Sequence, residues 1–82
     1  MKIVIKIPVY EFDIFLSQCA DRLEESTLLN TGERFSHEVQ GMMKDLVSIA
    51  CDRAQATKLL KVAECMDSPA GEHIRRALGY PL

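Results

Sequence analysis

The sequence predicts a small α+β domain, mostly helical, with one N-terminal strand followed by about four helices. Residues 2–7 alternate strictly between two sets of side chains, which is typical of a strand. The remainder carries apolar residues at helical spacing, interrupted by turn and capping residues. Because the chain has 82 residues, of which 48% are hydrophobic, we expect one globular domain over residues 1–82.

The predicted strand presents two different faces. Ile3, Ile5 and Ile7 point one way, and Lys2, Val4 and Lys6 point the other. Pro8 lacks a backbone donor and either ends the ladder or starts the next helix. A single strand leaves backbone donors and acceptors unpaired, so it needs a neighbour. That neighbour is a cryptic local strand, the strand of a second copy, or the sheet edge of a partner.

The first helix is expected over Val9–Ser26. Its apolar stripe consists of Phe12, Phe15, Leu16, Cys19 and Leu23. Tyr10 and Ile14 lie one turn apart on the opposite side of this helix. Either the strand continues through them, since apolar residues also alternate there, or they form an exposed contact pair.

The middle of the chain is predicted as a loop followed by a helix. Asn30-Thr31-Gly32 marks a turn within the connector Thr27–Phe35, and a plain loop is favoured there over a small hairpin. Ser36 is expected to cap a helix that runs to Ala50. Gly41 is a weak position inside that helix.

The apolar stripe of this helix changes sides further along the chain. It occupies one face over residues 36–50 and a different face over residues 56–66, so the helix either breaks near Asp52 or continues as one rod. A third helix is expected over Ala54–Met66. The last helix follows Ser68-Pro69 and ends at Leu78, with Gly79 as its C-terminal cap. The predicted core comprises Ile5, Ile7, Phe12, Phe15, Leu16, Leu23, Val39, Met43, Leu46, Leu60 and Ile74.

Composition gives no sign of an enzyme or of a cofactor. Cys19, Cys51 and Cys65 are scattered and lack the paired spacing of a zinc site, so we expect free thiols and a cytoplasmic setting. The isolated glycines form no phosphate-binding loop. No apolar run approaches the ~20 residues that span a membrane. The net charge of −2 argues against nucleic-acid binding through bulk charge alone.

The leading functional hypothesis is a small non-enzymatic protein-binding module. Acidic residues concentrate between Glu11 and Glu38, where they suit a basic partner such as a nucleic-acid-handling complex. An inhibitor or regulator of the phage or mobile-element kind, which blocks a larger complex sterically, fits this pattern. The residues predicted to bind the partner are Tyr10, Ile14, Asp21, Glu24 and Glu25. A purely structural oligomer is a further possibility.

The order of elements over Lys2–Ala50 supports an alternative. A short strand, a proline, a helix, a Gly-containing turn and a Ser-capped second helix resemble the ribbon-helix-helix DNA-binding dimers. The resemblance implies a dimeric transcriptional repressor whose N-terminal strands pair and enter the major groove. It also implies base contacts from Lys2, Val4 and Lys6 and phosphate contact at Ser36. A homodimer through the N-terminal strand would follow.

Overall fold

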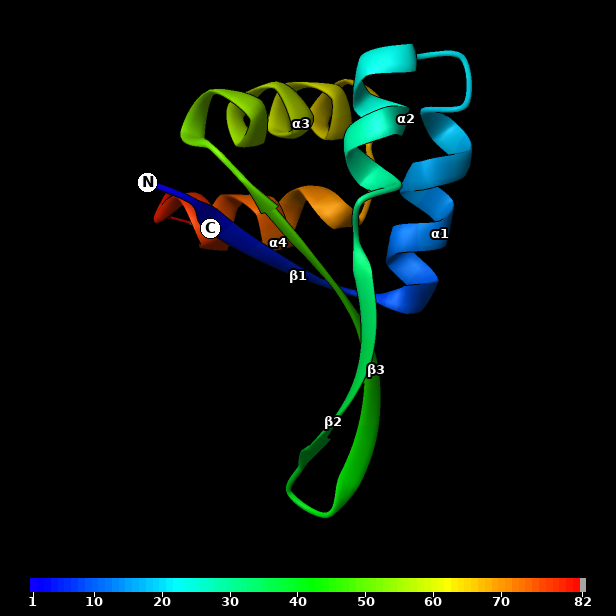
Figure 1. The fold of residues 1–82 in the computed structure, drawn as a ribbon, viewed down its shortest axis with the longest axis vertical. Coiled ribbons are helices and arrows are strands. Elements are labelled where there is room, and N and C mark those ends of the chain that lie inside the picture. The colour runs from blue at the N-terminus through cyan, green and yellow to red at the C-terminus, as the bar shows by residue number, and fades with distance from the viewer. Residues whose placement is uncertain (82) are drawn as a thin grey trace.

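The computed structural model describes residues 1–81 and contains three strands and four helices (Figure 1). In chain order the elements are β1 (Ile3–Pro8), α1 (Val9–Gln18), α2 (Leu23–Leu29), β2 (Glu33–Val39), β3 (Met42–Cys51), α3 (Arg53–Cys65) and α4 (Ala70–Leu78). The α+β class is as expected, but the prediction of a single N-terminal strand was wrong. Within residues 1–81, no helix is both long enough and apolar enough to cross a membrane.

The three strands form one antiparallel sheet in the order β1-β3-β2. β1 therefore finds its neighbour inside the chain, which is the cryptic local strand considered above. Ile5 lies opposite Ile49 and Ile7 lies opposite Val47, so the inward faces of β1 and β3 coincide. This match of two alternating apolar patterns fixes the register, because a slip of one residue would expose every buried side chain.

A hairpin replaces the helix that was expected from Ser36 to Ala50. Val39 pairs with Met42 across a two-residue turn in which Gln40 has φ of +51° and Gly41 has φ of +79°. Two successive positive φ values define the type I′ turn, whose twist suits a hairpin. Gly41 is thus the turn glycine and not a weak point in a helix. Ser36 lies within β2 and caps nothing.

The predicted first helix is divided in two. α1 ends at Gln18, a turn follows, and α2 begins at Leu23, so the expected helix over Val9–Ser26 is interrupted. The break redirects the chain so that Leu29, at the end of α2, is fully buried while Leu23 stays 85% exposed. Only residues 30–32 remain of the long connector that was expected after the first helix.

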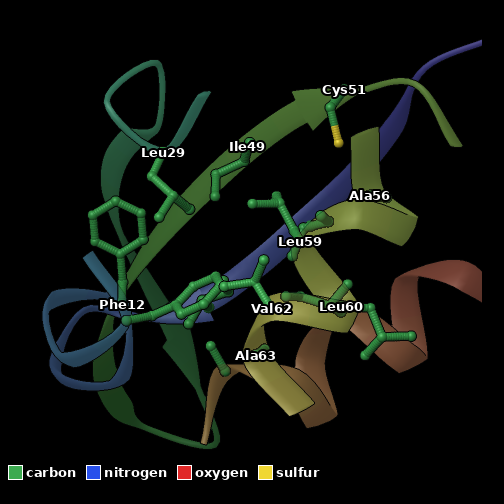
Figure 2. Packing of buried hydrophobic residues seen from close by; sticks show 14 of the residues in the cluster. Phe12, Leu29, Ile49, Cys51, Ala56, Leu59, Leu60, Val62 and Ala63 are labelled. Carbon is green, nitrogen blue, oxygen red and sulfur yellow. The ribbon is translucent and has the colours of Figure 1, made fainter. Parts of the chain in front are cut away.

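The helices cover one face of the sheet and enclose the core (Figure 2). The buried side chains are Ile5, Ile7, Phe12, Phe15, Cys19, Leu29, Val47, Ile49, Cys51, Ala56, Leu59, Leu60, Val62, Ala63, Ala70, Ile74 and Leu78. Six of the predicted core residues are among them, namely Ile5, Ile7, Phe12, Phe15, Leu60 and Ile74. Leu16, Val39 and Leu46 are half-buried, and the prediction was wrong for Leu23 and Met43, which are exposed.

The C-terminal helices follow their capping signals. The carboxylate of Asp52 accepts from the backbone N–H of Gln55, and the Gln55 side chain accepts from the backbone N–H of Asp52, which completes a capping box. This box starts α3, so the chain breaks near Asp52 and does not form one long rod. Gly79 has φ of +80° and ends α4 in the left-handed conformation, as expected.

Candidate binding surfaces

One face of the sheet is free of helices, and we call it the open face. Along β1 and the second half of β3, buried residues alternate with residues on this face, whereas β2 contains no buried residue. The open face consists of Val4, Lys6 and Pro8 from β1, Met42, Lys44, Leu46, Ser48 and Ala50 from β3, and Glu33, Phe35, His37 and Val39 from β2.

The strand register arranges the open face in rows. Pro8, Leu46 and Phe35 stand side by side across β1, β3 and β2, and all three are half-buried by one another and their neighbours. Towards the hairpin end, Val39 pairs with Met42, which is 66% exposed. The open face therefore has an apolar centre and an apolar tip, although a solvated sheet face is usually polar.

The charges on the open face differ in sign from those of the whole chain. Lys6 and Lys44 lie on it, Lys2 is exposed just before β1, and Glu33 is its only carboxylate within the described residues. The chain carries a net charge of −2. The positive charge on this face is thus a local feature, surrounding an apolar centre, and it suits an anionic ligand.

The outer half of the β2–β3 hairpin extends beyond the helices, as Figure 1 shows. Met43, on the opposite side of β3 from Met42, is 65% exposed because no helix reaches it. Two adjacent methionines thus project on opposite sides of the hairpin end. Their unbranched, polarizable side chains adapt readily to apolar partners.

The residues predicted to bind a protein lie on α1 and α2, away from the open face. Tyr10 is 78% exposed in the first turn of α1, and Ile14 is half-buried one turn later. Asp21 lies in the turn after α1. Glu24 already pairs with Lys58 of α3 at 2.9 Å, and Glu25 is half-buried. The acidic residues that follow α1 are thus separated from Tyr10, at its start, by roughly the 15 Å length of a ten-residue helix.

The structure distributes the predicted DNA-binding residues over two faces. Val4 and Lys6 lie on the open face and Lys2 flanks it. Ser36 projects from the other face, where its hydroxyl donates to the Asp45 carboxylate at 2.6 Å. The ribbon-helix-helix arrangement requires a second helix at Ser36, and the chain forms a hairpin there. That resemblance is therefore corrected, since the order of elements on which it rested is absent.

Side chains capable of catalysis or metal binding are dispersed through the described chain. Among residues 1–81, no three His, Cys, Asp or Glu side chains group as metal ligands. His73 of α4 contacts the Glu11 carboxylate of α1 at 2.6 Å, and this half-buried pair joins two helices. Burial raises the pKa of the Cys19 and Cys51 thiols, which disfavours the nucleophilic thiolate.

Sequence reasoning missed the hairpin residues of the open face, Phe35 and Met42 above all. A signal was present, because Phe35, His37 and Val39 alternate with polar residues and lead into Gln40-Gly41. Comparison with known proteins finds no matching family model, no matching curated protein and no matching solved structure.

Proposed function

We propose that this chain is a non-enzymatic protein-binding module that docks through the open face and the hairpin end. The observation that carries the proposal is the apolar row Pro8–Leu46–Phe35 on a sheet face without helices, with a second apolar pair, Val39 and exposed Met42, beyond the polar pair His37–Lys44. Apolar and aromatic residues at the centre of a patch supply most of the affinity in protein interfaces, and a charged rim supplies specificity.

The charge of the rim indicates the chemistry of the partner. Lys2, Lys6 and Lys44 outnumber Glu33 on this surface, so the complementary surface is acidic. A protein fits better than a nucleic acid because the face contains no arginine and its centre is apolar. Interfaces with nucleic acids are more polar and much more positively charged than interfaces between proteins.

An inhibitory or regulatory role follows from binding without chemistry. Occupation of a partner's acidic surface excludes any other ligand of that surface, and a rigid sheet held by an apolar core suits such steric exclusion. We place the protein in the cytoplasm, where a reducing environment keeps Cys19, Cys51 and exposed Cys65 as free thiols.

The experiment compares capture of cellular proteins by three variants of the chain. Val39→Thr with Met42→Lys alters the open face only at exposed or half-buried positions. Leu23→Lys is the matched control, because Leu23 is equally apolar and lies on α2. Tyr10→Ala with Ile14→Ser tests the α1 surface. Circular dichroism establishes that each variant is folded.

A protein retained by the wild-type chain and by Leu23→Lys, but lost with Val39→Thr/Met42→Lys, supports the proposal. Loss only with Tyr10→Ala/Ile14→Ser assigns docking to α1 and overturns the use of the open face. Fluorescent single-stranded and duplex oligonucleotides provide the third arm of the test. Binding at low salt that requires Lys6 and Lys44 would assign the face to nucleic acid instead.

A further inference from the structure

The outer edge of β2 is a row of backbone groups without a partner strand. β2 pairs only with β3, and no helix packs closely along it. Val39 and Met42 flank a two-residue turn and therefore form a hydrogen-bonded pair. Because such pairs alternate along an antiparallel ladder, Arg34, Ser36 and Glu38 direct their N–H and C=O groups to the free edge.

The side chains at this edge are self-complementary in charge. If a second β2 runs antiparallel about a two-fold axis at Ser36, Arg34 of each copy faces Glu38 of the other. Ser36 then faces its own counterpart, and all three facing pairs belong to the hydrogen-bonding set. Registers shifted by two residues along the strand lose both opposite-charge pairs, so charge and backbone geometry select the same alignment.

We propose that two copies of this chain associate edge to edge through β2, antiparallel and in this register. The interface is isologous, as in most soluble homodimers. Pairing joins the two three-stranded sheets into one sheet and places the two open faces side by side. The dimer forms through β2 and not through the N-terminal strand, because α4 packs against β1 whereas no helix packs closely along β2.

Intrachain contacts leave the edge available. Arg34 forms an ion pair with Asp13 of α1 at 3.0 Å, but both side chains are more than half exposed, and such pairs contribute little to stability. Glu38 makes no ion pair within residues 1–81. The Ser36 hydroxyl is engaged by Asp45, whereas its backbone groups face outward.

Charge exchange tests the register. Light scattering behind a sizing column should give a dimer mass for the wild-type chain that falls on dilution. Arg34→Glu alone and Glu38→Arg alone place like charges opposite each other, so each should raise the dissociation constant about tenfold or more. The double variant restores both opposite-charge pairs and should dimerise again. An equimolar mixture of the two single variants should form the heterodimer.

Two controls separate edge pairing from local damage. Asp13→Asn removes the same intrachain ion pair as Arg34→Glu but should leave the dimer intact. Ser36→Pro deletes the outward N–H without breaking the β2–β3 ladder, and should abolish the dimer, whereas Ser36→Ala should not. A wild-type chain that is monomeric up to ~1 mM overturns the proposal.

A dimer that survives both single charge reversals would overturn this register and assign association to another surface. The outcome is independent of the docking proposal. Edge pairing lies in the plane of the sheet, so the variants at Arg34 and Glu38 should still capture any partner of the open face.

Discussion

Replacement of Gly32 by alanine should destabilise the fold through a single close contact. A Cβ at this position would lie 2.6 Å from Cγ1 of Val47 and 3.1 Å from the carbonyl oxygen of Leu29. Here the chain passes from α2 to β2 directly over the inward side chains of β3. Inserting a methyl group into a packed site of this kind typically destabilises by 1–3 kcal/mol, so we expect about 2 kcal/mol.

The effect is large enough to measure by thermal or urea unfolding. For a domain of this size, ~2 kcal/mol corresponds to a fall in melting temperature of about 8–16 °C. Val47→Ala removes the closest atom and, alone, should destabilise by about 2 kcal/mol through lost burial. The double variant should be more stable than the sum of the two losses implies, by about 1 kcal/mol. Strict additivity would refute the argument, since it would mean that Gly32 and Val47 do not compete for space.

Four further predictions concern the helix ends and the thiols. Asp52→Ala removes the capping box of α3 and should destabilise by about 1 kcal/mol in urea titrations, whereas an unchanged midpoint would contradict the role of the cap. Gly79→Ala forces a side chain into φ of +80° and should lower the melting temperature, corresponding to about 1 kcal/mol. In the folded chain only exposed Cys65 should react rapidly with a thiol reagent, and fast modification of three thiols would disprove the burial of Cys19 and Cys51. Burial raises the pKa of the Cys19 and Cys51 thiols from the ordinary value of 9.0. The stabilisation linked to these thiols is therefore complete below pH 9.0 and is lost as the pH rises through their folded-state pKa values. The free energy of unfolding should decline less steeply in alkaline buffer when both cysteines are replaced by alanine.

The sequence predicts best where structure is determined locally. β1 is predictable because isoleucine recurs at every second position and lysine occupies two of the alternate positions, and α3 and α4 are located approximately because their ends carry strong capping residues. These signals act within a few residues of each other along the chain. They require no knowledge of what packs against them.

The hairpin was missed because one set of its apolar residues has helical spacing and another set alternates as in a strand. Val39, Met42, Met43 and Leu46 have helical spacing, while Val47, Ile49 and Cys51 alternate as in a strand. The strand conformation prevails because β3 supplies hydrogen-bonding partners for the backbone groups of β1, which would otherwise be unpaired. The open face was missed for the same reason, because only pairing places Phe35 beside Leu46. The residues predicted on α1 and α2 remain a separate, untested surface.

The central position of β3 has a consequence for the order of folding. Val39 and Met42 are joined by two residues, so the β2–β3 hairpin can close within microseconds. Ile3 and Cys51 are separated by most of the chain, and β1 can add to the sheet only after that long loop closes. During synthesis β1 emerges before β3, so β1 has no partner strand until β3 is made. Until then its isoleucines remain open to association with other chains, and the native sheet is completed from a hairpin that begins in the middle of the sequence.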